Sequence, residues 1–256
     1  MKADAFFLDG LLIKNRFFMG SSGFQSPDQI YRSVALAKPS VMTLSLKKEQ
    51  GVGLGFRRLL DQLKNEVLLL PNTAGCFSAR EAVRTACIAR EMLGTHWIKL
   101  EVTGDPVSLF PDPLELLIAS KELIAQGFFV LPYTNDDPVI GEKLLEAGCQ
   151  VLMPLAAPIG SGLGPVNLSR LKYFRKKFPK TPLIIDAGIG RPSHACLLME
   201  EGFDGILANT AIAGSGDPVH MAEAFSLAVS SGRQARLSQI RPALDSDDLF
   251  GFEGDL

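Results

Sequence analysis

Residues 127–154, GFFVLPYTNDDPVIGEKLLEAGCQVLMP, contain a strand, a helix and a second strand in succession. The apolar run FFVLPYT (128–134) predicts a buried strand. Asp137-Pro138 predicts a helix start, because aspartate accepts hydrogen bonds from free helix amides and proline needs no acceptor at the first helical position. Gly148 suits the left-handed turn that ends a helix, and the apolar run QVLMPLAA (150–157) follows it. This order is typical of a parallel βαβ unit.

Eight apolar runs of this kind follow one another along the chain, separated by segments of helix length. They are FFMG (17–20), VMTLSLK (41–47), VLLLPNT (67–73), WIKLEV (97–102), FFVLPYT (128–134), QVLMPLAA (150–157), PLIIDAG (182–188) and GILANTA (205–211). Asp112-Pro113 and Asp217-Pro218 repeat the helix-start signal, and Gly127 repeats the helix-end signal. Eight βα units in 256 residues predict a (β/α)8 TIM barrel, of the α/β class. A doubly wound open sheet is the alternative, because a sequence does not show strand order.

The chain is long enough for one large core, since 46% of its 256 residues are hydrophobic and 21% are charged. We therefore expect a single domain over residues 1–256. Residues 1–15, with Asp9-Gly10 between FFLD and LLIK, predict a short N-terminal hairpin that covers the bottom of the barrel. Residues 234–256 lose the βα repeat and predict an irregular C-terminal tail.

Composition and charge exclude several classes of protein. The net charge of −2 gives no basic surface for nucleic acid or for an anionic membrane. No apolar run approaches the ~18 residues of a membrane helix, and Asp4 and Asp9 interrupt the start of the chain where a signal peptide would be apolar. The three histidines lie apart without metal-ligand spacing, so we expect no metal site.

The four cysteines contain no CxxC pair and predict free thiols, as in the reducing cytoplasm. They are Cys76, Cys87, Cys149 and Cys196. We therefore expect a cytoplasmic protein.

The run WIKLEV (97–102) has two charges where the other strands have aliphatic residues. Side chains alternate along a strand, so Lys99 and Glu101 point into the barrel, with Glu101 nearer the mouth where barrel enzymes have their active sites. Burial disfavours an ammonium group, so we expect a lowered pKa for Lys99. The neutral amine would add to a ketone and form a Schiff base. A structural Lys99–Glu101 ion pair is the alternative.

Asp186, near the end of the seventh predicted strand, predicts a second carboxylate facing the same cavity. Proton transfer on an enolisable sugar requires such groups beside the Schiff base. The alternative is an aspartate that only caps a helix or braces a loop.

Glycine-rich turns follow the sixth, seventh and eighth predicted strands. Ala187-Gly188-Ile189-Gly190 and Asn209-Thr210 predict a phosphate site, because their backbone amides can approach an anion. The loop APIGSGLG (157–164), which contains Gly160, Ser161 and Gly162, predicts a lid or a further phosphate contact. A plain connecting loop is equally compatible with its composition.

Several motifs of this chain are similar to those of one known family. They are LLLPNTAGC (68–76), LGTHWIKLEV (93–102), QGFFVLPYTNDDPV (126–139), VLMPLAAPIGSGLG (151–164), IIDAGIGRPSHA (184–195) and NTAIA (209–213). Together they resemble the ThiG family, the bacterial thiazole synthases of thiamine biosynthesis. The resemblance covers about Arg16 to Arg233.

The resemblance implies a (β/α)8 barrel enzyme, a sulfur-transferring transferase that needs no metal or organic cofactor. It would join 1-deoxy-D-xylulose 5-phosphate, dehydroglycine (2-iminoacetate) and sulfur from a thiocarboxylated sulfur carrier protein into a thiazole phosphate. The resemblance places the Schiff base on Lys99 and the acid/base carboxylates on Glu101 and Asp186. It also implies a homotetramer. The implied sugar-phosphate contacts are Gly160, Ala187, Gly188, Asn209 and Thr210.

The chain departs from the family pattern at Ser21-Ser22-Gly23-Phe24, where the family has threonine-glycine-lysine-tyrosine. A lysine is therefore absent near the expected barrel mouth, whereas the strand lysine and both carboxylates remain. Two alternatives to a thiazole synthase stay open. One is another Schiff-base enzyme of the class I aldolase type, and the other is a barrel that binds a sugar phosphate or a partner without turnover.

Overall fold

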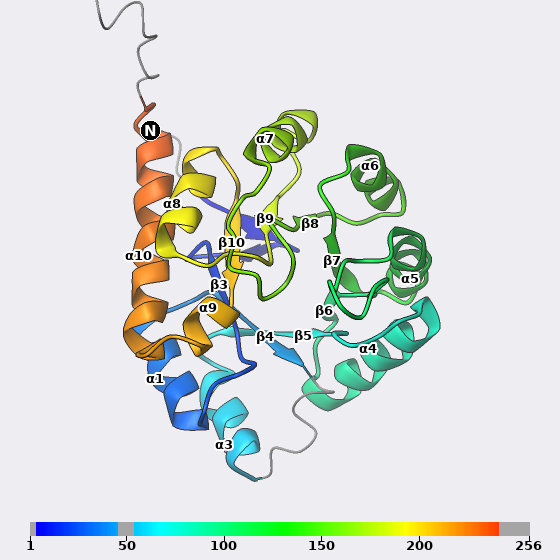
Figure 1. Cartoon of the computed structure of the whole chain (residues 1–256). Helices are drawn as coiled ribbons and strands as arrows, with labels where there is room; N and C mark the ends of the chain where they lie inside the picture. Colours follow the sequence, from blue (N-terminus) through cyan, green and yellow to red (C-terminus); the bar gives the residue numbers. More distant parts are fainter. Residues whose placement is uncertain (1–3, 46–53, 241–256) are drawn as a thin grey trace, which may run out of the picture.

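Eight parallel strands form a ring at the centre of the molecule, with helices outside it (Figure 1). The computed structural model describes residues 4–45 and 54–240. The strands are β3 (Phe17–Gly20), β4 (Val41–Ser45), β5 (Leu68–Asn72), β6 (Trp97–Leu100), β7 (Phe129–Thr134), β8 (Met153–Pro154), β9 (Ile184–Ile185) and β10 (Gly205–Ala208). Each lies within one of the eight predicted runs; residues 46–47 of the second run lie outside the described residues.

The ring is closed. Hydrogen-bonded strands follow the order β8-β7-β6-β5-β4-β3-β10-β9, and the parallel bridges Leu152–Leu183 and Leu155–Asp186 join the two ends. Closure leaves no unpaired strand edge in the sheet. The TIM barrel prediction is therefore confirmed, and the open-sheet alternative is excluded.

The described helices include those whose starts and ends the Asp-Pro and glycine signals predict. They are α1 (Pro27–Ala37), α3 (Leu54–Leu63), α4 (Ala79–Leu93), α5 (Pro113–Ala125), α6 (Pro138–Glu146), α7 (Leu168–Lys177), α8 (Pro192–Glu200), α9 (Thr210–Ala213) and α10 (Pro218–Leu237). The side chains of Asp112, Asp137 and Asp217 each accept hydrogen bonds from amides in the first turn of their helices. Gly127 and Gly148 adopt positive φ angles of 81° and 104° after α5 and α6. No helix in the described ranges is long and apolar enough to cross a membrane.

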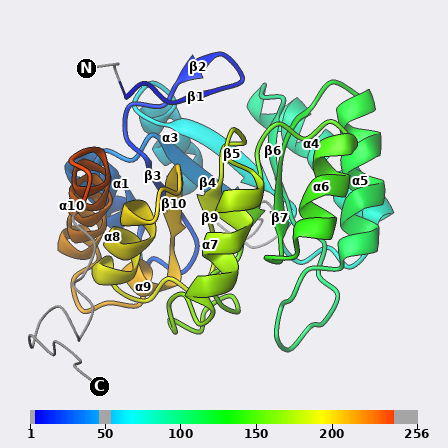
Figure 2. The ribbon, with the colours of Figure 1, turned by 90° about the horizontal axis from the view of Figure 1, so that it is seen from above.

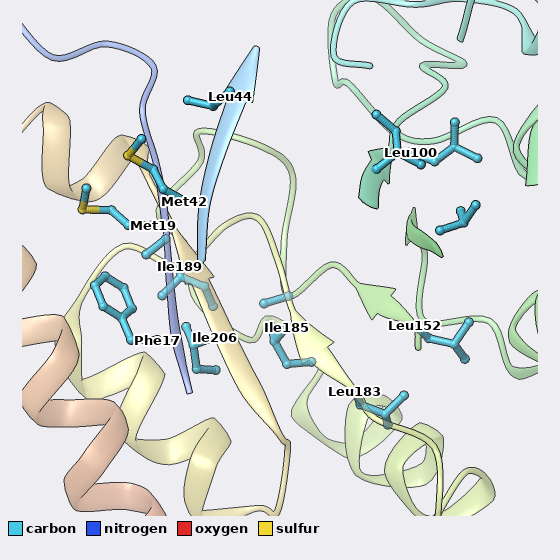
Figure 3. Packing of buried hydrophobic residues seen from close by; sticks show 14 of the residues in the cluster. Phe17, Met19, Met42, Leu44, Leu100, Leu152, Leu183, Ile185, Ile189 and Ile206 are labelled. Carbon is cyan, nitrogen blue, oxygen red and sulfur yellow. The ribbon is translucent and has the colours of Figure 1, made fainter. Parts of the chain in front are cut away.

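Alternation along the strands divides the buried apolar residues into two cores. Ile98, Leu100 and Val102 belong to the larger core between strands and helices. Figure 3 shows Phe17 of β3 beside Ile206 of β10 in this core. Trp97 instead belongs to the smaller core inside the barrel. The side chains of β6 therefore point as predicted, with Trp97 packing inside the barrel.

A two-stranded hairpin, β1 (Phe7–Leu8) and β2 (Leu11–Leu12), covers one end of the barrel. Figure 2 shows it at the end opposite α9. Leu8 is buried in the interior core, and Asp9 at the hairpin turn accepts a 2.9 Å hydrogen bond from Trp97 Nε1. The hairpin predicted within residues 1–15 is therefore present in the described part of that segment, and it closes the N-terminal end of the barrel.

The predicted irregular tail is wrong at its start, because α10 continues to Leu237 and so includes residues 234–237. Gln234, Ala235 and Arg236 favour helix, which explains why α10 extends beyond the end of the βα repeat. Residues 241–256 of the predicted tail lie outside the described residues. The single domain over residues 1–256 stays a prediction.

Charged residues join the N-terminal segment to the barrel and to the last helix. Asp4 Oδ1 lies 2.9 Å from Arg16 Nη2, and Asp4 Oδ2 accepts a 3.0 Å hydrogen bond from Arg233 of α10. Arg16 also lies 3.7 Å from Asp204, whose carboxylate is 2.6 Å from Arg175 of α7. Hydrogen bonding from Arg233 and the nearby Arg16 charge hold the pKa of Asp4 below its ordinary value.

We expect Asp4→Asn to lower the free energy of unfolding by about 1 kcal/mol at neutral pH, because two arginines lose a partly exposed carboxylate partner. A lowered folded-state pKa makes this stabilisation complete above the ordinary aspartate pKa. It is lost as the pH falls through the folded-state pKa. Urea unfolding of Asp4→Asn and of the unsubstituted protein measures the difference between their free energies of unfolding. This difference should be smaller at acidic pH than at neutral pH.

Asp61→Asn is the matched control, because the side chains of the Lys64–Asp61 pair are 58% and 75% exposed. Its effect should stay within about 0.5 kcal/mol. Equal losses in the two variants would show that the Asp4 network does not stabilise the fold.

Candidate functional site

A cavity of about 320 Å³ lies at the C-terminal ends of the barrel strands. Lys99 reaches it from β6, Glu101 from the residue after β6, and Asp186 from the residue after β9. The turns after β9 and β10 and the loop after β8 form more of its wall. The cavity is therefore in the position where barrel enzymes carry out catalysis.

Three charged side chains are buried together at this cavity. Lys99, Glu101 and Asp186 are 5%, 7% and 3% exposed. Lys99 Nζ lies 3.1 Å from Glu101 Oε1 and 2.5 Å from Asp186 Oδ2. One ammonium group thus pairs with two carboxylates, a more elaborate arrangement than the Lys99–Glu101 pair weighed from the sequence.

The expected lowering of the Lys99 pKa is wrong for the free protein. Burial does lower the pKa of Lys99, but the charges and hydrogen bonds of Asp186 and Glu101 outweigh it and raise the pKa above its ordinary value. The expected lowering followed from the loss of water alone, whereas the charges of both Glu101 and Asp186, which were expected at the same cavity, decide the direction of the shift. Lys99 is therefore an ammonium group in the free protein at neutral pH.

Hydrogen bonds hold the backbone of Glu101 and the carboxylate of Asp186 in place. Thr73 Oγ1 donates to the backbone oxygen of Glu101 at 2.7 Å and accepts from the backbone nitrogen of Glu101 at 2.8 Å. Asp186 Oδ1 accepts a 2.7 Å hydrogen bond from the backbone nitrogen of Ala187. Ala187 has a φ of 59°, a left-handed conformation that costs a non-glycine residue about 1–2 kcal/mol. This strained residue lies directly beside a candidate catalytic carboxylate.

The turn after β9 packs backbone to backbone against the loop after β8. Gly164 N donates to Gly188 O at 2.8 Å. A Cβ atom on Gly188 would overlap Ala157, and one on Gly190 would overlap the backbone of Gly162. Only glycine therefore fits at positions 188 and 190 without moving the adjacent loop.

Amide groups in this turn are available to an anion. Within the described residues, the backbone nitrogens of Gly188 and Ile189 donate no hydrogen bond to the protein. Both residues line the cavity. Unpaired backbone amides in residues that line a cavity are candidates for binding the oxygens of a phosphate group.

Asn209 and Thr210 line the cavity from the end of β10. Asn209 packs over Gly20 of β3 so closely that a Cβ atom on Gly20 would be 2.5 Å from Asn209 Cβ. The Oδ1 atom of Asn209 is buried without a hydrogen-bond partner among the described residues. Buried oxygens without a hydrogen-bond partner are uncommon in folded proteins, and this atom belongs to a residue that lines the cavity.

The structure brings nearly all the predicted site residues to this one cavity. Those that line it are Lys99, Glu101, Gly160, Gly162, Asp186, Ala187, Gly188, Ile189, Gly190, Asn209 and Thr210. Ser161 is exposed and is not part of the wall. Their roles in binding and catalysis stay predictions. Within the described ranges, no three His, Cys, Asp or Glu side chains gather as metal ligands.

Sequence reasoning missed polar residues on neighbouring strands. Thr43 and Ser45 of β4 line the cavity, and so does Thr103 after β6. Thr43 and Ser45 stand two positions apart, and that spacing alone indicates a shared face of the strand. Leu109 lines the cavity from a long loop, and no pattern in the sequence predicts its position.

A family model described as "Thiazole biosynthesis protein ThiG" matches residues 8–247. The chain belongs to the ThiG family. This membership confirms the resemblance read from the sequence motifs and the predicted enzyme class. Curated ThiG relatives named thiazole synthase include one from Agrobacterium fabrum, 51% identical over 90% of each chain. Another, from Neisseria gonorrhoeae, is 50% identical over 89% of this chain and 88% of its own.

Solved structures agree with the barrel. The Amycolatopsis orientalis BexX/CysO complex contains a chain that matches 93% of this protein and 98% of its own length, with a TM-score of 0.85 and 26% identity. A 3-hexulose-6-phosphate synthase matches with a TM-score of 0.58 and 15% identity over 83% of this chain and 99% of its own. The second likeness concerns the fold alone.

We expect Gly188→Ala to destabilise the protein by about 3 kcal/mol, through left-handed strain together with overlap against Ala157. Gly127→Ala is the control, because Gly127 has a similar φ of 81° but open space around its Cβ position. That variant should lose only about 1–2 kcal/mol. Urea unfolding of the two variants measures the difference, and equal losses would contradict the close packing of the two loops.

Proposed function

We propose that this protein forms a thiazole phosphate from 1-deoxy-D-xylulose 5-phosphate, dehydroglycine and sulfur from a thiocarboxylated carrier protein. The reaction proceeds through a Schiff base between Lys99 and the sugar ketone. The observation that carries the proposal is the buried Lys99 ammonium between Glu101 and Asp186 at the cavity. Membership of the ThiG family supports the same reaction.

Schiff-base formation starts from an ammonium group and therefore needs a proton acceptor. Glu101 and Asp186 each contact Lys99 Nζ, so either carboxylate can take a proton when the ketone replaces part of the charged contact. The neutral amine then adds to the carbonyl carbon. The carbonyl oxygen leaves as water, and the protonated imine forms.

The same carboxylates serve the next step. A protonated imine attracts electrons from the adjacent carbon, so a carboxylate can remove a proton from that carbon. The enamine that results can then react with the nitrogen and sulfur components. Lys99 thus supplies the electron sink, while Asp186 or Glu101 moves the proton.

The phosphate of the sugar binds at the turns after β9 and β10. Support comes from the unpaired amides of Gly188 and Ile189 and from the position of Asn209 and Thr210 on the same cavity wall. Gly160 approaches from the loop after β8. That loop, with Ser161 exposed on it, acts as a lid.

The sulfur donor is a small carrier protein that docks at the barrel mouth. BexX, which shares this fold at 26% identity, was solved in complex with CysO. We further propose a homotetramer in the cytoplasm. Membership of the ThiG family supports the tetramer, and four free cysteines suit a reducing compartment.

We expect borohydride to trap 1-deoxy-D-xylulose 5-phosphate on Lys99, because reduction converts the imine into a stable amine. Peptide mass spectrometry locates the added mass. Lys99→Ala should abolish the adduct and retain cooperative unfolding, whereas Lys172→Ala, on the exposed face of α7, should leave it intact. An unmodified Lys99 peptide in the unsubstituted protein would exclude the Schiff base.

With the thiocarboxylated carrier and an iminoacetate source added, we expect a thiazole phosphate as the product. Mass spectrometry of the small molecules detects it. Adduct formation without this product would favour an aldolase-like enzyme instead. Absence of both the adduct and the product would favour a barrel that binds without turnover.

A further inference from the structure

Tyr133 lies on β7, between β6 with Lys99 and β8, which pairs with the segment of Asp186. Its side chain is 2% exposed. Strand alternation places it on the inner side with Phe129 and Leu131, which belong to the core inside the barrel. Lys99 Nζ is 5.7 Å from the centre of the Tyr133 ring. Tyr133 therefore packs directly beside the buried ion cluster.

The Tyr133 hydroxyl is buried and has no hydrogen-bond partner among the residues that the structure describes. Leaving a buried hydroxyl without a partner costs free energy, and folded proteins satisfy most such groups. Phenylalanine would fill almost the same volume without this cost. Packing alone therefore does not explain a tyrosine at this position.

Asp186 offers a matching acceptor. Its Oδ1 accepts from Ala187 N at 2.7 Å, whereas Oδ2 contacts Lys99 Nζ at 2.5 Å and has no other donor within the described ranges. The Lys99 ammonium has three hydrogens and serves both Asp186 and Glu101. In the protonated imine the nitrogen keeps one hydrogen, because two leave with the carbonyl oxygen as water. A single hydrogen cannot donate a full hydrogen bond to each of the two carboxylates, as the ammonium group can.

We propose that the Tyr133 hydroxyl donates a hydrogen bond to Asp186 Oδ2 once Lys99 has formed the Schiff base, directly or through one water molecule. Tyr133 is then a positioning residue, which orients the Asp186 carboxylate while Asp186 removes the proton beside the imine. This inference rests on the proposed function, because it requires the Schiff base. The step consumes only the ketone and the ammonium and yields the protonated imine and water.

The surroundings keep the Tyr133 hydroxyl protonated. Burial raises its pKa above the ordinary value, and the charges of Asp186 and Glu101 raise it further. The phenol therefore remains a donor at neutral pH. It can replace a lysine hydrogen at a carboxylate without adding a third negative charge.

Tyr133→Phe tests this inference. The protein is incubated with 1-deoxy-D-xylulose 5-phosphate in D2O, and deuterium uptake at the carbon beside the imine is followed across a range of pH. We expect exchange to slow about tenfold to a hundredfold, as for the loss of a hydrogen bond to a charged group. A carboxylate without that donor binds its proton more tightly, so the acidic limb of the rate profile moves to higher pH. The yield of borohydride-trapped adduct and the thermal midpoint should not fall.

Thr134→Val is the matched control. It removes another buried hydroxyl without a described partner, from the next residue, which strand alternation places on the opposite face. Its exchange rate and pH profile should equal those of the unsubstituted protein.

Unchanged exchange and an unchanged pH profile in Tyr133→Phe would overturn the inference and leave the proposed function standing. A markedly lower thermal midpoint would also overturn it, because the hydroxyl would then have a partner in the free protein. Absence of any adduct in the unsubstituted protein would instead overturn the proposed function, and this inference with it.

Discussion

The contact of one ammonium group with two buried carboxylates is the interaction on which the site depends. Lys99 compensates for the burial of Glu101 and Asp186, and they compensate for the burial of Lys99. A buried charge without a partner would cost several kcal/mol, so none of the three is replaceable alone without loss. In the free protein Lys99 is therefore an unreactive ammonium group. In the proposed reaction, binding of the substrate must lead to its deprotonation.

Barrel closure makes this contact possible. β6 and β9 are distant in the sequence, and Asp186 reaches Lys99 because β8 and β9 pair at the point where the ring closes. In the proposed reaction, the glycine turns beside Asp186 fix the position of the sugar phosphate relative to Lys99. Fold and chemistry thus depend on the same few residues around the end of β9.

The eight strands, the helix starts and the inward direction of Lys99 were predictable from the sequence, because they follow from local apolar runs, capping residues and strand alternation. The direction of the Lys99 pKa shift was not, because it depends on how closely Glu101 and Asp186 approach the ammonium group, and only the three-dimensional structure gives those distances. The position of Leu109 was hidden for a similar reason, since the course of a long loop depends on tertiary contacts. For the proposed phosphate site, the family resemblance implied individual residues, whereas glycine content indicated only which turns to consider.

The hairpin at the N-terminal end of the barrel affects the order in which the sugar and the sulfur carrier can bind in the proposed reaction. Leu8 and Trp97 fill that end, and Asp9 holds the hairpin to Trp97. Among the described residues, the cavity at Lys99 is thus a well that is closed at this end and lies at the C-terminal ends of the strands. In the proposed reaction, the sugar bound to Lys99 lies at the bottom of this well, so it must enter before the protein that delivers sulfur covers the opening. In this order of events, the thiazole phosphate leaves after the carrier protein has withdrawn.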